Sequence, residues 1–368
     1  MGYGKTLITA GMVGALAVSV GTRPAQATGL DVVPGSRYTS VRAASLGGAY
    51  LPLADDGASG LFYNPAGIGK IRGTRLELAN LQFQLNSQFI GNFDMDFYKV
   101  TSLSAYKSSL VNHPNSMPGV GAAFAPTFSF RGFSVGLLAE SRFAGKTDTA
   151  EIRYRSRYLL VPAAGYALRL ASGVVRIGYS VQWVNKAEGD NIVPMTQSPL
   201  GWNQYLDKGS GLSHNAGFSL TLPFEYLPSA HVVARNIGTL RYSSSAVMPL
   251  AANPYGKPRD EPMQVDAAMG FTSKAGGGAS FNLVGEWRDM TNTSGVSLMG
   301  HLSVGAEMNF RENFFLRLGI GSGYPSLGLG FRTRKADLNL GWYSEETGQT
   351  FRSERDARFA LQYQIRAF

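Results

Sequence analysis

Apolar and polar residues alternate one by one along most of the chain after residue 75. Because successive side chains of a β-strand point to opposite faces, a period of two predicts strands with one apolar and one polar face. The pattern recurs in roughly fourteen segments, an even number that suits a closed bacterial barrel. One clear example has these apolar positions: Val175, Ile177, Tyr179, Val181 and Trp183.

A soluble β-sandwich would also show this alternation, so other features must separate the two folds. The apolar faces are aromatic or aliphatic over about ten residues, the length of a tilted membrane-spanning strand. The chain ends on Phe368, and a terminal aromatic residue resembles the sorting signal of bacterial outer-membrane barrels. Phe368 is out of register with Phe359 and Tyr363, which a β-bulge would correct. We predict an all-β, transmembrane antiparallel β-barrel over residues 75–368.

Stretches rich in proline, glycine and asparagine interrupt the alternation and are predicted to be loops at residues 112–119, 189–211 and 243–262. The last two are long, and we expect them on the extracellular side, where barrel loops are usually longer. The weakest predicted strands are residues 97–106 and 230–236.

The first 27 residues have the features of a secretory signal peptide. Lys5 precedes the uncharged stretch 7–20, and Ala25-Gln26-Ala27 provides a small-residue cleavage site. The stretch is too short to span a bilayer as a helix. We therefore expect cleavage before Thr28 and export to the bacterial outer membrane.

Composition fits an exported barrel. Charged residues make up 16% of the chain, below the roughly 25% usual in soluble domains. The chain has no Cys, which excludes a disulfide scaffold and a cysteine-based zinc site. Removing Lys5 and Arg23 leaves 32 basic and 25 acidic residues, so the net charge falls from +9 to +7. We interpret this charge as lumen and rim residues near anionic lipopolysaccharide, with no nucleic-acid partner.

Residues 28–74 lack the period of two and contain three short motifs. The Gly47-Gly48 pair allows a sharp turn or close packing. Either Asp55 or Asp56 can cap a short helix. The sequence Asn64-Pro65-Ala66-Gly67 has the residues of a tight turn.

These motifs, placed between a signal peptide and a barrel, resemble the N-terminal hatch of the FadL superfamily of outer-membrane barrels. The resemblance is closest to the branch of PorV-like and uncharacterised outer-membrane proteins, and extends to the glycine-rich residues 309–342. It implies a fourteen-stranded barrel with residues 28–74 as a hatch in its lumen. Transporter members take up hydrophobic ligands, which leave sideways through the wall, whereas PorV-like members hold and shuttle secreted proteins.

The resemblance leaves two functions open. The first is passage or holding of a hydrophobic small molecule in a hatch-lined pocket that a small hatch shift opens. The alternative is a PorV-like binding barrel that docks secreted or surface proteins through its long loops. The hydrophobic capture loops of fatty-acid transporters are not obvious in this sequence. Expected partners are outer-membrane lipid, lipopolysaccharide, the barrel assembly machinery, and either the small molecule or a secreted protein.

One cluster of charge stands out in the predicted strands. It consists of Arg153, Arg155 and Arg157 on one face of a strand, with Glu140 and Arg142 on the strand before. Such a basic ladder can hold an anionic headgroup or steer an acidic partner. We favour a solvated lumen wall, since polar lumens carry charge. The same interpretation covers Asp266, Glu286, Arg288, Glu307, Arg317 and Asp337.

No catalytic, metal or cofactor site is predicted. Asp55 and Asp56 alone supply too few oxygen ligands for calcium, and the four histidines are scattered. The sequence Gly-Ile-Gly-Ser-Gly at residues 319–323 places Ser322 wrongly for a nucleophile elbow. We therefore expect a protein that is not an enzyme.

Overall fold

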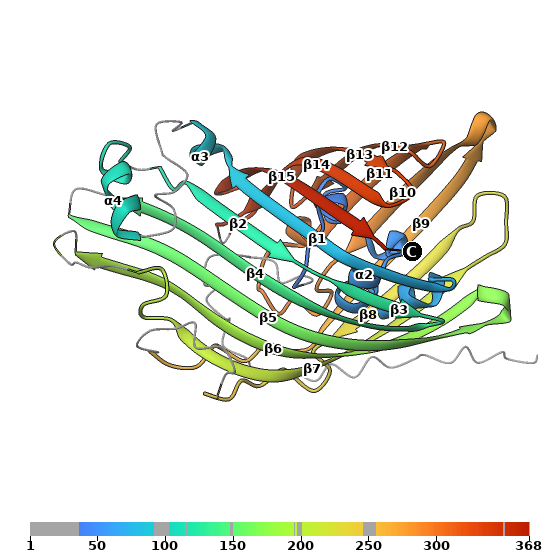
Figure 1. The fold of residues 1–368 in the computed structure, drawn as a ribbon, viewed down its shortest axis with the longest axis horizontal. Helices are drawn as coiled ribbons and strands as arrows, with labels where there is room; N and C mark the ends of the chain where they lie inside the picture. Colours follow the sequence, from blue (N-terminus) through green and yellow to red (C-terminus); the bar gives the residue numbers. More distant parts are fainter. Residues whose placement is uncertain are drawn as a thin grey trace, which may run out of the picture.

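The computed structural model describes residues 37–91, 103–114, 116–147, 150–194, 196, 201–245, 255–348 and 350–367. The predicted signal peptide and the predicted sorting signal Phe368 lie outside these residues. Within them, strands dominate and join into one antiparallel sheet (Figure 1).

The sheet contains strands of very different length. Their bounds are β1 Thr74–Asn86, β2 Gly119–Phe124, β3 Thr127–Phe130, β4 Phe133–Thr147, β5 Glu151–Leu170, β6 Val175–Pro194, β7 Asp207–Thr221, β8 Ser229–Arg235, β9 Gln264–Ala275, β10 Ala279–Trp287, β11 Leu302–Phe310, β12 Phe314–Gly321, β13 Tyr324–Arg332, β14 Ala336–Glu346 and β15 Arg355–Arg366.

The sheet closes on itself because β15 pairs with β1. β2 and β3 each pair with both β1 and β4, so they are two parts of one strand interrupted at Ala125 and Pro126. The barrel therefore has fourteen strands, as predicted. A register shift between Glu77 and Ala79 places a bulge in β1, opposite the end of β15, rather than in the last strand itself.

The two faces of the strands separate a membrane barrel from a sandwich. On β6, Ile177 and Tyr179 are 45% and 46% exposed, whereas the alternate residues Ser180 and Gln182 are 0% and 2% exposed. A sandwich would bury the apolar face between its sheets. Here the apolar face points outward and the polar face inward, which confirms the predicted transmembrane type of barrel.

The remaining regular elements are short. They are α1 Val41–Ala44, η1 Leu51–Leu53, α2 Gly57–Phe62, η2 Pro65–Lys70, α3 Ser87–Gly91, α4 Leu103–Val111, η4 Ala171–Gly173, η5 Gly276–Gly278 and α5 Leu298–His301. No helix in the described part of the chain is both long and apolar enough to cross a lipid bilayer.

The predicted strand at residues 97–106 is wrong where the structure describes it, because Leu103 begins helix α4. Leu103, Tyr106 and Leu110 recur every three or four residues and pack together with Trp202 in one buried cluster. The predicted strand at 230–236 is confirmed as β8.

The two ends of the barrel have connections of different length. At the end where β1 begins and β15 finishes, the turns are short; at the other end, α3 and α4 lie between β1 and β2 (Figure 1). The predicted loop at 189–211 is too long, because residues 189–194 belong to β6 and 207–211 to β7. The ladder continues there because Gly189 pairs with Ser156 of the long strand β5.

Candidate functional site: the N-terminal segment inside the barrel

Residues 37–73, which we call the N-terminal segment, lie inside the barrel, because their short helices contact strands on all sides of it: α2 contacts β4, η2 contacts β5–β7, η1 contacts β8 and β9, and α1 contacts β13–β15. Apolar side chains of the segment share buried clusters with inward-facing wall residues. Leu61 and Ile68 of the segment pack with Leu138 and Val161 of β4 and β5. A second cluster joins Leu51 and its neighbours in the segment to β8, β9 and β10.

Inward-facing glycines of the wall make room for the segment backbone. A Cβ atom added to Gly178 would lie 2.1 Å from the carbonyl carbon of Pro65. One added to Gly319 would lie 2.2 Å from the carbonyl carbon of Leu46. Such distances exclude any side chain, so wall and segment match in shape. Gly217, Gly305 and Gly321 also meet the segment backbone. Other wall glycines face side chains of the segment: Gly136, Gly165, Gly270, Gly328 and Gly341.

Gly47 and Gly48 form a left-handed turn pressed against the wall. Their φ angles are +67° and +87°, a conformation that favours glycine. A Cβ on Gly47 would lie 2.5 Å from the carbonyl carbon of Ile320, and one on Gly48 would lie 3.0 Å from the Arg288 guanidinium carbon. The backbone conformation favours glycine at both positions, and at Gly47 close packing on the wall backbone requires it as well.

Asn64 ties two short helices of the segment together. Its Oδ1 accepts a hydrogen bond from the amide of Ala66 at 3.1 Å, which caps η2. Its Nδ2 donates to the carbonyl of Leu51 at 3.0 Å. Asn64 is fully buried, and Pro65 packs on Gly178. A Cβ on Gly67 would lie 2.7 Å from the carbonyl oxygen of Ala54, so this motif also needs its last glycine.

The adjacent carboxylates Asp55 and Asp56 have separate structural partners. Asp56 caps α2: its Oδ1 accepts from the amide of Ser59 at 2.7 Å, and the Ser59 hydroxyl accepts from the Asp56 amide at 3.1 Å. Asp55 forms an ion pair of 2.9 Å with Arg42. Within the described residues, no group of three His, Asp or Glu side chains is placed to hold a metal ion.

Removing the side chain that caps α2 should lower the stability of the protein. We expect Asp56→Ala to lower the free energy of unfolding by about 1 kcal/mol, the usual value for a lost N-cap. Asp56→Asn should keep most of this stability, because the side-chain oxygen of asparagine also accepts a hydrogen bond from the amide of Ser59. Urea unfolding in detergent measures both variants. Glu225→Ala, an exposed turn residue, is the control, and an equal loss in that variant would contradict the capping role.

A buried charge cluster joins the segment to the wall at β11 and β12. Arg42 donates to both oxygens of Glu307, at 2.8 and 2.9 Å, and Arg317 donates to Glu307 at 2.7 Å. The Arg317 and Glu307 side chains are each 1% exposed. Burial opposes the charge on Arg42, but Asp55 and Glu307 outweigh burial and hold the pKa of Arg42 well above its usual value.

Other inward carboxylates also hold the segment. Glu286 accepts hydrogen bonds from the amides of Tyr50 and Leu51, at 2.7 and 2.9 Å. Asp266 orients Arg235, which donates to the carbonyl of Phe62 at 3.1 Å. The predicted solvated lumen wall is therefore wrong for these residues, because strand alternation gives the face of a side chain but not its partner.

The wall amides that tether the segment were not singled out from the sequence. Gln182 donates to the carbonyl of Leu61 at 2.9 Å, and Gln362 accepts from the amide of Val41 at 3.2 Å. Gln182 and Gln362 are glutamines at polar positions of alternating strands, and that inward position is the signal that could have identified them.

The predicted basic ladder is internally paired. Arg153 and Arg155 both form ion pairs with Asp190 of β6, at 2.7 and 3.0 Å. Arg142 and Arg157 both form ion pairs with Glu140, at 3.2 and 2.6 Å. Arg142 and Arg155 are buried rather than solvated. The two acidic partners thus neutralise part of the charge that the ladder was predicted to present.

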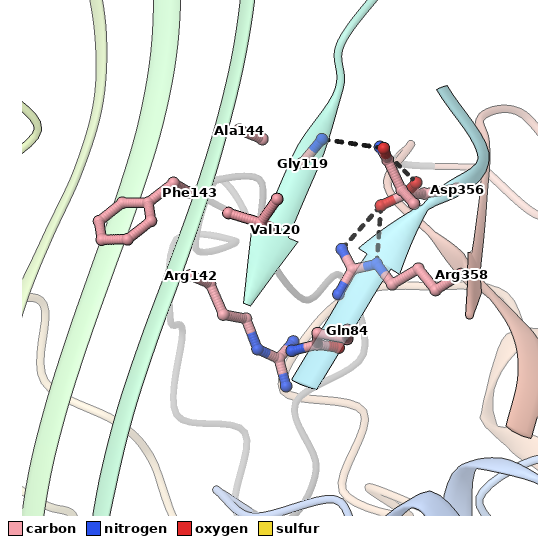
Figure 2. A pocket seen from close by; sticks show the side chains of 9 residues that line it. Gln84, Gly119, Val120, Arg142, Phe143, Ala144, Asp356 and Arg358 are labelled. Carbon is pink, nitrogen blue, oxygen red and sulfur yellow. Dashed lines mark hydrogen bonds and ion pairs between the residues drawn. The ribbon is translucent and has the colours of Figure 1, made fainter. Parts of the chain in front are cut away.

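A small polar hollow lies beside this cluster, between β1, β2, β4 and β15 (Figure 2). Arg358 donates to Asp356 at 2.7 and 2.8 Å, and Asn86 bridges Asp356 and the amide of Gly119. The Arg142 side chain points toward Gln84 on the other side (Figure 2). The hollow is small, and its lining mixes these paired polar side chains with Val120, Phe143 and Ala144, so it offers no extended apolar pocket for a hydrophobic ligand.

No protein-family model matches the sequence, and no curated protein matches it. Among solved structures, the CymD monoaromatic hydrocarbon channel superposes with a TM-score of 0.50 and 11% identity, covering 90% of this chain and 97% of that one. The Pseudomonas putida toluene transporter TodX gives 0.47 and 11%, covering 91% and 98%. A Pseudomonas aeruginosa FadL homologue gives 0.45 and 10%, covering 90% and 98%. By its strand order, its closure and its likeness to CymD, the protein has the fourteen-stranded barrel fold of the FadL-type outer-membrane hydrocarbon channels.

Proposed function

We propose that this protein is a channel of the bacterial outer membrane that passes or holds a hydrophobic small molecule, with the N-terminal segment as its hatch. The observation that carries the proposal is the fit of the segment into the lumen, where it packs against wall glycines and forms hydrogen bonds with buried polar side chains of the wall. The barrel fold shared with CymD, a monoaromatic hydrocarbon channel, supports this function.

The outer face of the barrel favours a membrane location. Large apolar side chains are exposed on most strands, for instance Phe133, Tyr166, Met269, Leu318 and Phe359. A water-soluble monomer rarely exposes so much contiguous apolar surface. Export by a cleaved signal peptide and insertion by the barrel assembly machinery belong to the same proposal.

The hydrophobic path runs on the side of β4, β5 and β6. There the segment meets large inward apolar residues, Leu138, Leu159 and Val161, whereas opposite strands present glycine, serine and charged side chains. A contact made of apolar side chains can separate around an apolar ligand without leaving polar groups unpaired. The buried ion pairs at β11 and β12 hold the other side of the segment during a small shift.

The interruption at Pro126 is the proposed sideways exit. Pro126 lacks an N–H group and cannot donate to the ladder with its neighbours. Ala125, immediately before it, belongs to the same buried cluster as Leu138 and Val161, so the break adjoins the hydrophobic path.

A single hydroxyl placed on the path should impair passage. Val161→Thr keeps the size of the side chain but puts a polar group where the ligand would pass. We expect uptake of radiolabelled toluene by cells carrying this variant to fall roughly tenfold, given the cost of an unpaired buried hydroxyl. Val284→Thr is the matched control, since Val284 is equally buried but lies in the cluster on β8–β10.

The outcome of this experiment also distinguishes the channel from the alternative, a PorV-like docking barrel. Equal uptake by both variants would contradict the placement of the path at β4–β6. Uptake by wild-type cells no greater than in cells without the protein would contradict passage of a hydrophobic molecule. Capture of a secreted protein at residues 201–206 and 255–262 by crosslinking in such cells would then assign the PorV-like docking role instead.

A further inference from the structure

The short-turn end of the barrel carries a ring of exposed basic residues. We call this set the basic ring: Arg72, Arg131, Arg169, Lys274, Arg311, Arg334 and Lys335. The exposed acidic residues at the same end are Glu225 and Glu312, so exposed side chains there contribute 7 − 2 = +5. This end therefore holds much of the excess positive charge of the chain.

Within the described residues, no carboxylate forms an ion pair with a ring residue. Ion pairs at this end join other side chains: Asp337, for instance, binds Arg332 at 3.1 Å and Arg366 at 2.6 Å. Arg131 lies over the Phe130 ring, and Arg169 donates to the carbonyl of Ser172. Neither contact neutralises a charge, so the guanidinium groups keep their capacity to bind anions.

Exposed aromatic residues flank the basic turns. Phe130 and Phe133 enclose the turn at Arg131, and they are 44% and 42% exposed. Phe310 likewise precedes Arg311, and Phe331 comes just before the turn that contains Arg334. Aromatic girdles of barrels mark the boundary between hydrocarbon and headgroups. The basic ring thus lies at the level of the headgroups, just beyond the aromatic side chains.

We propose that the basic ring binds the phosphate groups of anionic phospholipids in the leaflet at the short-turn end. Short turns face the periplasm in outer-membrane barrels, so this is the periplasmic leaflet. Lysine and arginine side chains near an anionic bilayer surface are attracted to its phosphate groups. This placement differs from the sequence-based interpretation, in which the net charge belongs to lumen and rim residues near lipopolysaccharide.

The distribution of the ring favours lipid over an acidic protein. Its members lie in or beside five of the six short turns, those joining β3–β4, β5–β6, β9–β10, β11–β12 and β13–β14, except Arg72, which precedes β1. A docked protein would contact one side of the barrel mouth, whereas headgroups surround the whole circumference. The proposal depends on the membrane location of the barrel, but not on which molecule the lumen passes.

Lipid retention tests the proposal without any small ligand. The protein is placed in nanodiscs of phosphatidylethanolamine and phosphatidylglycerol, extracted gently, and analysed by native mass spectrometry for bound lipid. The ring variant combines Arg131→Gln, Arg311→Gln, Arg334→Gln and Lys335→Gln. The control combines Arg241→Gln, Lys257→Gln, Arg259→Gln and Arg352→Gln, which removes the same charge from the long-loop end.

We expect wild type and control to retain phosphatidylglycerol in preference to phosphatidylethanolamine. In the ring variant the ratio of retained phosphatidylglycerol to phosphatidylethanolamine should be roughly tenfold lower. Heat-dependent migration in gels verifies that each barrel is folded; if the quadruple variant is not, the pairs Arg131/Arg311 and Arg334/Lys335 are replaced separately. Equal preference in ring variant and wild type would overturn the proposal. Ring-dependent binding of soluble poly-glutamate, with lipid preference unchanged, would also overturn it and assign the ring to an acidic protein.

Discussion

Replacing Gly178 by valine should displace the N-terminal segment while the barrel stays closed. A Cβ at Gly178 would lie 2.1 Å from the carbonyl carbon and 2.2 Å from the carbonyl oxygen of Pro65, which are backbone atoms and cannot rotate away. Overpacking of this kind costs about 1–3 kcal/mol. The ratio of molecules with the segment in its place in the lumen to molecules with the segment displaced should therefore fall by roughly ten- to a hundred-fold. In planar bilayers we expect a higher conductance, and in solution faster proteolysis of the segment.

Gly285→Val is the matched control for this prediction. Gly285 lies on β10 with no atom within 4 Å of an added Cβ, so valine fits there without displacement. Its conductance should equal that of the wild type. If both valine variants conduct alike, the wall glycines do not seat the segment as described.

Removing the Glu307 carboxylate should produce the largest loss of stability. Glu307 balances Arg42 of the segment and Arg317 of the wall, all three largely excluded from water. Breaking a buried ion pair by removing one partner costs about 3–5 kcal/mol, because the remaining charge stays buried and unpaired. We expect Glu307→Gln to shift the urea midpoint strongly downward and to expose the segment to protease. Glu312→Gln, on the exposed turn after β11, should change neither.

A double variant separates a specific ion pair from general disruption. In Glu307→Gln combined with Arg42→Met, one of the two cations that Glu307 balances is gone, so the combined loss should be smaller than the sum of the single losses. Strictly additive losses would show that Arg42 and Glu307 act independently and would contradict the cluster.

The alternation of the sequence predicted the barrel because a strand encodes its faces locally. The inward position of Glu307 and the outward position of Tyr179 both follow from a period of two. Contacts between the segment and the wall could not be predicted in the same way. Arg42 and Glu307 are 265 residues apart, and Gly178 gains its meaning only when Pro65 lies against it.

Two features that the sequence analysis missed, the Glu307–Arg317 ion pair and helix α4, had local signals in the sequence. Glu307 and Arg317 pair across the β11–β12 hairpin, so the turn at residues 311–313 would have revealed this ion pair. The spacing of Leu103, Tyr106 and Leu110 is helical, although residues 97–106 were predicted to form a strand. The underestimated length of β6 has another cause: Gly189 and Asp190 resemble loop residues, yet Asp190 pairs with arginines of β5.

A reversible crosslink between segment and wall tests the hatch directly. An added Cβ on Gly69 of η2 would lie 3.5 Å from the Cβ of Ala167 on β5, within the range of a disulfide, and the chain has no other cysteine. Toluene uptake is measured in Gly69→Cys/Ala167→Cys cells under oxidising and reducing conditions. The control Gly119→Cys/Ala144→Cys links β2 to β4, where the corresponding distance is 3.3 Å. Passage past a moving hatch predicts that oxidation abolishes uptake in the first pair alone and that reduction restores it; unchanged uptake by the oxidised first pair would contradict it.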